Sequence, residues 1–263
     1  LQRAAAATTK IFGLLDVESD VREASNMVSM PQFRDRIEFK SVTFAYPSVS
    51  EAAAAAKLDE ANIAISTAAP VLENFNLTIH KGEKIAIVGA TGSGKSTIIK
   101  LLLRHYDVQR GSITVDGIDI RGMDQQSLRR AFGTVPQDVF MFTDTIVANV
   151  GLGVFDRESV KDAARVVEAD RFITTLPDSY DTRLGERGAN LSFGERQLLA
   201  FARALAGGPA VLVLDEATSS VDSETEAQIQ RALDRLIEDR TAVIIAHRLS
   251  TIRNVDRIVV LHH

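Results

Sequence analysis

The sequence predicts an α/β fold with a mostly parallel sheet at its centre, and three observations support this prediction. The segments Val211–Leu214 and Val243–Ala246 are apolar at every position, which is typical of strands buried on both faces of a parallel sheet. Strand-like and helix-like segments alternate along much of the chain, as in βαβ units. The chain has 263 residues, of which 45% are hydrophobic, so it is long enough to bury a complete core.

The individual elements follow from residue type and periodicity. The expected strands are Ile37–Phe44, Phe75–Ile79, Lys84–Val88, Ser112–Val115, Gly133–Val135, Val211–Leu214, Ala242–Ala246 and Arg257–Leu261. The expected helices are Ser96–Arg104, Gln125–Ala131, Ser159–Glu168, Ser192–Leu205 and Ser223–Ile237. The last helix is expected to begin with a capping box formed by Ser223 and Glu226. Between Val135 and Val211 the pattern is mostly helical, which indicates a helical subdomain at about residues 138–207, inserted into the α/β core.

Two segments stand apart from this core. Residues 48–70 contain Glu51, five consecutive alanines and Lys57, and we expect a surface excursion without chemistry between two strands. The chain begins inside a helical pattern and ends with a strand, so both ends are interpreted as cuts in a longer polypeptide. The terminal pair His262 and His263 is either native or the remnant of a tag.

Composition excludes several functions. With 30 Lys and Arg against 35 Asp and Glu, the net charge is −5, which argues against a general nucleic-acid surface. The absence of cysteine excludes disulfides and thiolate metal sites. No apolar run approaches the roughly 20 residues of a membrane span, so we expect no direct span in this chain.

One glycine-rich segment lies between an expected strand and an expected helix and predicts a phosphate-binding loop. It matches the pattern G-x-x-x-x-G-K-[ST], and its candidate binding residues are Gly89, Thr91, Gly92, Ser93, Gly94, Lys95, Ser96 and Thr97. Glycines let backbone N–H groups turn toward an anion, and the helix N-terminus adds partial positive charge. Lys95 would reach the β- and γ-phosphates, and the Ser96 hydroxyl would bind Mg²⁺. The alternative is a glycine-rich turn that happens to precede a helix.

Two carboxylates follow the buried strand Val211–Leu214. Because the carboxyl edge of a parallel sheet faces the phosphates in proteins with such a loop, Asp215 is the candidate Mg²⁺ ligand. Its neighbour Glu216 is the candidate general base for an attacking water. The alternative is an acidic turn at the end of a strand.

Five further short segments before and after these motifs carry candidate functional residues. They are Phe44–Pro47, Val135–Asp138, Leu191–Glu195, Ala217–Asp222 and Ile245–Arg248. Together with the phosphate loop they resemble the A-loop, Q-loop, signature, D-loop and switch histidine of the nucleotide-binding domain of ATP-binding-cassette (ABC) transporters. The resemblance runs from about Ile37 to Leu261, nearly the whole chain.

This resemblance implies roles for several residues. Tyr46 would stack on adenine, Gln137 would lie near Mg²⁺ and the membrane domain, and His247 would be the switch histidine at the γ-phosphate. Ser192, Gly194, Glu195 and Asp222 would meet ATP bound to a second copy. The residues alone leave structural alternatives open for four of these positions. Tyr46 could pack on the sheet, and Gln137 could be turn surface. His247 could be an edge histidine, and Ser192 could cap its own helix.

The signature departs from the family pattern at two positions, where Phe193 replaces glycine and Glu195 replaces glutamine. A carboxylate next to a polyphosphate opposes closure unless it turns back into the helix cap or pairs with a cation such as Arg196. We therefore expect Glu195→Gln to tighten ATP-driven dimerisation.

The resemblance also implies an architecture and partners. It implies an antiparallel β subdomain beside the parallel core, an ATP-binding domain at residues 35–263, and a connector from a membrane domain at residues 1–34. Thr182–Gly188 resembles a segment typical of exporters. The implied protein is a dimerising ATPase that uses ATP and Mg²⁺ at the cytoplasmic face of the inner membrane and exports an unidentified substrate.

Two alternatives remain. A soluble ABC ATPase of translation or chromosome maintenance is disfavoured because the chain has no long coiled-coil insertion, basic patch or second cassette. A non-hydrolysing ATP sensor is disfavoured by the presence of Lys95, Asp215, Glu216 and His247.

Overall fold

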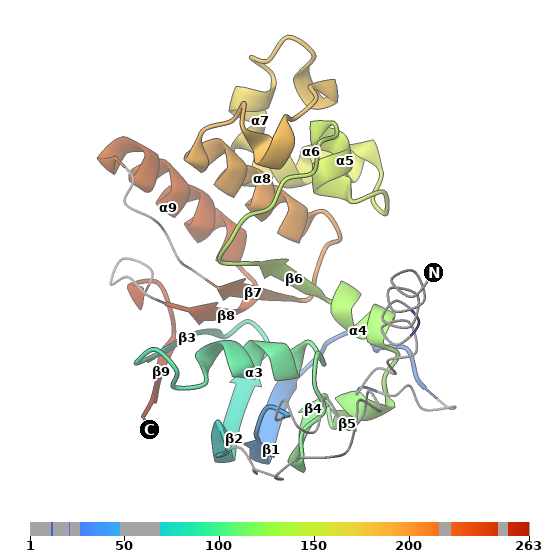
Figure 1. Cartoon of the computed structure of the whole chain (residues 1–263), viewed down its shortest axis with the longest axis vertical. Helices are drawn as coiled ribbons and strands as arrows, with labels where there is room; N and C mark the ends of the chain where they lie inside the picture. The colour runs from blue at the N-terminus through green and yellow to red at the C-terminus, as the bar shows by residue number, and fades with distance from the viewer. Residues whose placement is uncertain are drawn as a thin grey trace, which may run out of the picture.

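A parallel sheet and an antiparallel sheet lie on either side of one helix, α3 (Lys95–Leu102), in the computed structural model (Figure 1). The structure describes Phe12, Val21 and residues 27–47, 69–215, 222–246 and 252–262. Most of the expected connector, and residues 48–68 of the expected insertion, are therefore outside the described residues.

The parallel sheet has the strand order β6-β7-β8-β3-β9. Its strands are β6 (Phe132–Val135), β7 (Val211–Asp215), β8 (Thr241–Ile245), β3 (Lys84–Gly89) and β9 (Arg257–Leu261). All four neighbouring pairs are parallel, so every strand ends at the same edge of the sheet. Such a shared carboxyl edge is the place where open α/β sheets bind ligands.

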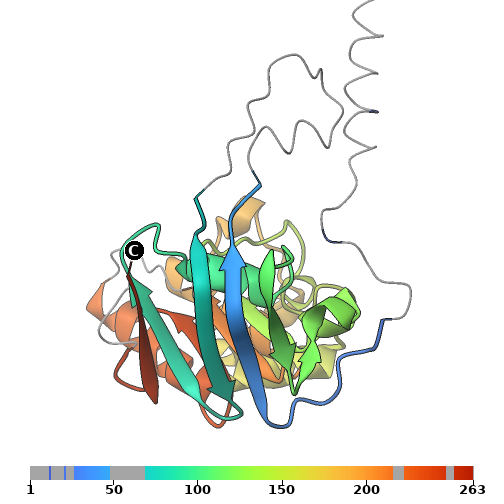
Figure 2. The same ribbon diagram turned by 90° about the horizontal axis from the view of Figure 1, so that it is seen from below.

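The antiparallel sheet has the order β2-β1-β4-β5 and covers the other side of α3 (Figure 2). Its strands are β2 (Leu72–His80), β1 (Arg36–Phe44), β4 (Arg110–Val115) and β5 (Ile118–Asp119). The mixed fold, with one parallel and one antiparallel sheet, confirms the predicted fold class.

Helices cover the face of the parallel sheet opposite α3 (Figure 1). They are α5 (Ile146–Gly151), α6 (Arg157–Val166), α7 (Ala169–Ile173), α8 (Phe193–Leu205) and α9 (Ser223–Ile237), with 3₁₀ turns η3 (Ser179–Asp181) and η4 (Glu186–Gly188). A further 3₁₀ turn, η2 (Ile120–Gly122), and helix α4 (Gln125–Arg130) connect β5 to β6. The mostly helical pattern predicted between Val135 and Val211 is confirmed.

Successive residues of the central strands point into two different cores. Val211 and Val213 of β7 join the core around α3, whereas Leu212 and Leu214 join the core beneath α8 and α9. The side-chain period of two along a strand produces this division. The prediction that this segment is buried on both faces is therefore confirmed, because each face has its own helical cover.

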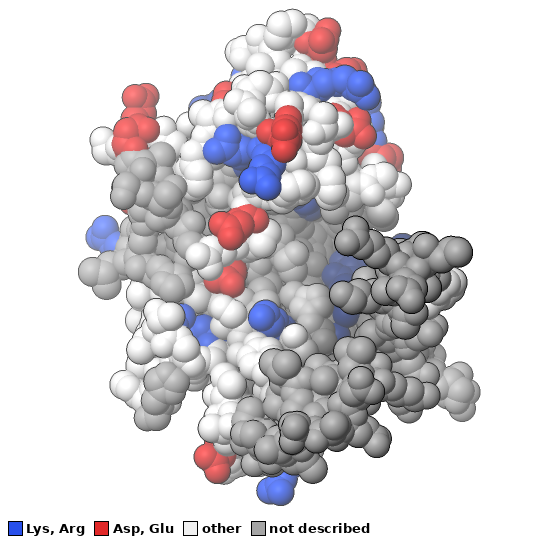
Figure 3. Space-filling view, in the orientation of Figure 1, with Lys and Arg blue, Asp and Glu red and all other residues white. Residues whose placement is uncertain are grey.

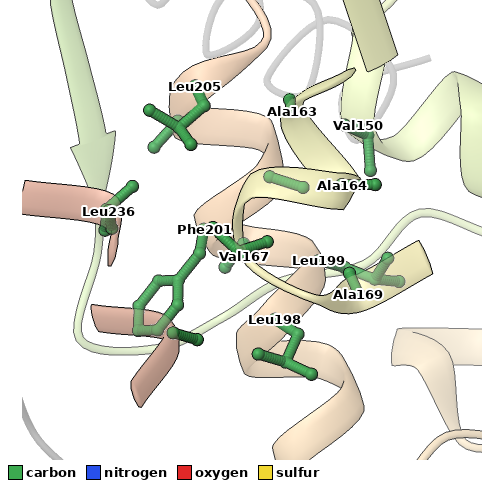
Figure 4. Close-up of a cluster of buried hydrophobic side chains, with 14 of the residues drawn as sticks. Val150, Ala163, Ala164, Val167, Ala169, Leu198, Leu199, Phe201, Leu205 and Leu236 are labelled. Atoms are coloured by element: carbon green, nitrogen blue, oxygen red, sulfur yellow. The ribbon is translucent and has the colours of Figure 1, made fainter. Parts of the chain in front are cut away.

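Helix α8 is the centre of the helical layer. Figure 4 shows its residues Leu198, Leu199, Phe201 and Leu205 facing side chains of α5, α6, α7 and α9. Burying a Leu or Phe side chain of this kind stabilises the fold by about 1.5–3 kcal/mol. The helix that follows the signature segment is thus anchored by its apolar face.

The outer surface of the helical layer carries local ion pairs. Arg157 pairs with Asp181 at 2.8 Å, and Arg165 pairs with Asp162 at the same distance. On the face shown in Figure 3, acidic and basic side chains are interspersed over this layer. Within the described part of the chain, no helix has the length and apolar character needed to cross a membrane.

Some local predictions were incomplete or wrong. The short elements β5, α5 and α7 were not predicted, because two to six residues carry too little periodicity to be recognised. The capping box predicted at Ser223 was wrong: Asp222 is the N-cap of α9, and its Oδ1 accepts a hydrogen bond from the Thr225 N–H at 2.9 Å. The carboxylate of Asp222, one residue earlier, is the stronger acceptor and lies in the favourable field of the helix N-terminus.

Candidate functional site

The glycine-rich loop connects β3 to α3, as predicted, and two of its positions favour glycine, Gly89 because a Cβ would clash and Gly94 because of its backbone conformation. A Cβ at Gly89 would lie 2.6 Å from the Leu261 backbone oxygen of β9 and 2.7 Å from Ser93 Oγ. Gly94 has φ of 93°, a left-handed conformation, and its Cβ would lie 3.0 Å from a Leu72 methyl group. The loop is therefore confined between β9 and the start of β2.

The N-terminus of α3 has no side-chain cap. Gly94 is the N-cap residue, and in the part of the chain that the structure describes no side-chain cap hydrogen bond is made at this end of α3. The first N–H groups of a helix have no partner within the helix, so they require a cap, water or a ligand. Together with the helix dipole, they form a site suited to an anion.

Lys95 and Ser93 complete this cradle. The Lys95 ammonium is buried and donates hydrogen bonds to the backbone oxygens of Gly89 at 2.9 Å and Ala90 at 2.8 Å. Ser93 Oγ is buried and has no hydrogen-bond partner among the described residues. A buried hydroxyl without a partner is costly, so this atom is suited to bond a ligand held in the loop. Uncapped amides, a buried cation and an unpaired hydroxyl all fit a phosphate group.

Ser96 and Asp215 meet at the carboxyl edge of the parallel sheet. Ser96 Oγ lies 3.4 Å from Asp215 Oδ2, although 119 residues separate them in the chain. Gln137 follows β6 by two residues, and Val135 at the end of β6 pairs with Leu214 of β7. No group of three or more His, Cys, Asp or Glu residues that could hold a metal occurs among the described residues. One hydroxyl and one carboxylate are suited to Mg²⁺, which usually keeps waters and substrate phosphates as its remaining ligands.

Tyr46 is placed against the same helix. Its hydroxyl lies 3.0 Å from Thr97 Oγ1, and the Lys100 ammonium lies 5.3 Å from the centroid of its ring. Phe44 and Tyr106 contact the ring edge to face, with centroids 5.1 Å and 5.3 Å away. The side chain expected to stack on adenine is thus hydrogen-bonded to the segment expected to bind the phosphates.

Sequence reasoning did not single out Lys100 and Tyr106. The signal for Lys100 is its spacing from Thr97, since residues three apart share one face of a helix. Tyr106 carries no such signal, because its contact with Tyr46 depends on how the loop after α3 folds back.

The signature segment forms a complete capping box at the start of α8. Ser192 Oγ accepts from the Glu195 N–H at 3.2 Å, and Glu195 Oε2 accepts from the Ser192 N–H at 2.7 Å. Glu195 therefore turns back into the cap, one of the two arrangements expected from the sequence. Arg196 instead donates to the Leu191 backbone oxygen at 2.6 Å, and Phe193 packs against the core of the helical layer.

Gly194 brings the starts of α8 and α9 together. A Cβ at this position would lie 2.7 Å from Thr225 Cγ2 in the first turn of α9. Asp222, which caps α9, is therefore close in space to the signature. The signature residues and Asp222 therefore lie near one another. They do not lie near the phosphate loop of the same chain, because α3 and α8 are on opposite faces of the parallel sheet (Figure 1).

The structure leaves two candidates undescribed. Glu216 directly follows β7, and His247 follows β8 by two residues, but both lie outside the described residues. The strands that precede them are neighbours with parallel pairing, Asp215 opposite Ile245.

Comparison with known proteins identifies the family that this site and fold define. The model of the ABC transporter family matches residues 72–219, more than half of the chain. The chain therefore belongs to the ABC transporter family, a family of transport-coupled ATPases. This confirms the resemblance stated from the motifs.

Individual relatives agree with this assignment. The chain is 42% identical to an ATP-dependent lipid A-core flippase of Syntrophus aciditrophicus, over 99% of this chain and 40% of that protein. It is also 42% identical to the ABC transporter ATP-binding protein YknV of Bacillus subtilis, over 98% of this chain and 40% of that protein. A solved structure of a bacterial Atm1-family ABC exporter with ATP bound superposes with a TM-score of 0.80 at 37% identity, over 99% of this chain and 43% of that one. The chain thus spans about two fifths of the length of these relatives.

Proposed function

We propose that this chain binds and hydrolyses ATP with Mg²⁺ as the motor of a membrane exporter. The observation that carries the proposal is the phosphate cradle at α3, with its uncapped amides and buried Lys95, next to the contact between Ser96 and Asp215. Groups suited to bind phosphate and Mg²⁺ thus come from distant parts of the chain to the edge of one sheet.

Each group has a chemical task in this proposal. Lys95 and the first N–H groups of α3 hold the β- and γ-phosphates, and Tyr46 stacks on adenine. Ser96, Gln137 and Asp215 hold Mg²⁺, which when bound neutralises phosphate charge. Glu216 accepts a proton from water as the water oxygen bonds to the γ-phosphorus and the bond to the bridging oxygen breaks. His247 hydrogen-bonds the γ-phosphate and positions that water.

We further propose that two copies share each ATP. Because α3 and α8 lie on opposite faces of the sheet, the signature of one copy is available to the phosphate loop of another rather than to its own. Ser192, Gly194, Glu195 and Asp222 would then complete the partner's site. Hydrolysis would reopen the pair and drive the attached membrane domain.

The setting of the chain is part of the proposal. Residues 35–263 would be the ATP-binding domain, with residues 138–207 as its helical subdomain and residues 1–34 as the connector from a membrane domain in the same polypeptide. The greater length of the relatives is consistent with such a fusion. The domain would lie at the cytoplasmic face of the inner membrane. Several of the relatives carry the name lipid A-core flippase, so lipid A-core is the first substrate to test in the full-length protein.

Phosphate release by the purified chain tests this function. We expect wild type to release phosphate from ATP, with specific activity that rises with protein concentration because one copy lacks a complete site. Glu216→Gln should slow turnover by about 10²-fold or more while ATP binding is retained. Undiminished turnover in Glu216→Gln would refute the assigned base, and flat specific activity across the dimerisation range would refute the shared site.

A further inference from the structure

Arg129 of α4 holds the far end of the phosphate-binding helix α3. Its Nε donates to the Leu103 backbone oxygen at 3.1 Å, and its Nη2 donates to the Arg104 backbone oxygen at 3.0 Å. Leu103 is the C-cap residue of α3, so this guanidinium binds carbonyl groups just where the helix ends. A cation in this place also complements the negative end of the helix dipole.

Arg104 makes the reciprocal contact. Its side chain is almost fully buried, and its Nη1 donates to the Met123 backbone oxygen at 3.1 Å, immediately before the Asp124 cap of α4. Its Nε bonds Asp107 at 3.0 Å. Each arginine thus binds the backbone of the other's segment, and we call the pair Arg104 and Arg129 the arginine clasp.

The clasp connects two parts of the proposed site. Helix α3 has only 8 residues, so its C-terminal end is two turns from Lys95 and Ser96. Helix α4 leads through β6, of 4 residues, to Gln137. The proposed phosphate-binding residues at the start of α3 and the proposed metal ligand Gln137 are therefore each separated from the arginine clasp only by short helices or strands.

We propose that Arg129 is a positioning residue for nucleotide binding, which sets the placement of the phosphate helix relative to the Gln137 segment. It touches no substrate and acts through α3 and α4. The inference rests on the proposed function, because it assigns a role in binding ATP and Mg²⁺. A displacement of the order of 1 Å in a binding group is enough to lower its contribution by a large factor.

Arg130 provides a matched control. It is the next residue of α4 and, like Arg129, lines the cleft of about 500 Å³ between α4, β6 and the helical layer. Its guanidinium has no hydrogen bond or ion pair with any residue that the structure describes. Replacing Arg130 therefore removes the same charge from the same cleft without releasing α3.

The test compares Arg129→Gln, Arg129→Lys and Arg130→Gln in the whole 263-residue chain, well below their unfolding temperatures. The measurements are the Kd for ATP with Mg²⁺ by calorimetry and the Mg²⁺ concentration for half-maximal phosphate release. We expect both values to rise about tenfold in Arg129→Gln, less in Arg129→Lys because an ammonium can still bond one carbonyl, and to stay at wild-type values in Arg130→Gln.

A purely structural role predicts a different result, namely a lower unfolding temperature with an unchanged Kd and Mg²⁺ requirement in the folded variant. That result, or equal shifts in Arg129→Gln and Arg130→Gln, would overturn the inference. If Arg129→Gln does not fold, Arg129→Lys decides the question by the same two measurements. Failure of wild type to bind ATP would instead refute the proposed function.

Discussion

Helices α3 and α8 both begin at segments proposed to meet phosphate, yet their N-termini are built in opposite ways. The start of α3 has a glycine N-cap, no side-chain acceptor and a buried lysine. The start of α8 has a complete capping box, with Ser192 and Glu195 each bonded to the other's backbone. The first terminus leaves its amides to water or a ligand, whereas the second has two of its N–H groups bonded by its own side chains.

This difference indicates that the two helix N-termini of the proposed shared site contribute differently to ATP binding and to dimer closure. The uncapped end of α3 offers positive charge and free donors, so it supplies affinity for phosphate. The capped end of α8 is held in shape by its own residues, and its carboxylate adds negative charge. We therefore expect α3 to dominate binding and α8 to tune closure.

The largest effect is expected at the cation of α3. Lys95→Met removes the buried ammonium, and we expect ATP affinity to fall by about 10²-fold or more, since charge-assisted contacts to phosphate are among the strongest in such sites. Lys81→Met is the control, because it removes the same charge from an exposed position in the turn between β2 and β3, at the other end of β3 from the phosphate loop. Isothermal titration with ATP measures both. Equal losses in the two variants would mean that general charge, rather than the cradle, binds phosphate.

The next effect concerns the glycine of the signature. In Gly194→Ala the new Cβ meets Thr225 Cγ2, and Thr225 is a stiff β-branched residue, so we expect the free energy of unfolding to fall by about 1–3 kcal/mol. Thr225→Ser removes that methyl group while keeping the hydroxyl. Urea denaturation should show most of the loss recovered in the double variant. A double variant no more stable than Gly194→Ala would show that another contact requires the glycine.

A smaller effect is expected from the carboxylate in the cap of α8. Glu195→Gln keeps an amide oxygen for the Ser192 N–H but removes the negative charge near the partner's phosphates. Because Glu195 is turned back into the cap, its charge opposes closure only weakly, so we expect ATP-driven dimerisation to tighten by no more than about 2–5-fold, the range of a single charge at a helix N-terminus. Light scattering with a non-hydrolysable ATP analogue measures it, with Glu158→Gln in the first turn of α6 as control. Equal or weaker dimerisation in Glu195→Gln would contradict the proposed position of this carboxylate.

The smallest effect is a pH dependence at the neighbouring cap of α9. The hydrogen bonds from Thr225 to Asp222 lower the pKa of this carboxyl below its ordinary value of 3.8. Between the folded and unfolded pKa values the unfolded chain binds the proton, so this stabilisation is complete above about pH 4 and is lost as the pH falls further. Asparagine caps a helix about as well as aspartate, so Asp222→Asn should keep stability at pH 7 and lose this acid sensitivity. The measurement is urea unfolding of wild type and Asp222→Asn between pH 7 and pH 3. Identical dependence of the unfolding free energy on pH in the two proteins would contradict the lowered pKa of Asp222.

The strands and the phosphate loop were predictable because their signals are local. Val211–Leu214 is apolar throughout, and the glycine-lysine-serine pattern defines its own turn and helix start. The contact of Ser96 with Asp215 was predictable only in outline, from the shared edge of a parallel sheet. The arginine clasp was not predictable, because Arg104 and Arg129 bind backbone oxygens whose positions depend on how η2 and α4 pack beneath α3.

The sequence by itself determined the class of fold, the phosphate loop, the capping pattern of Ser192 and Glu195, and the family, since each is encoded by residue types at fixed short spacings. The tertiary structure alone decided that α3 and α8 lie on opposite faces of one sheet, that Thr97 and Tyr46 meet, and that Gly194 fits against Thr225. These contacts join residues far apart in the chain, and they depend on which side of a strand each residue points to and on how closely two backbones approach.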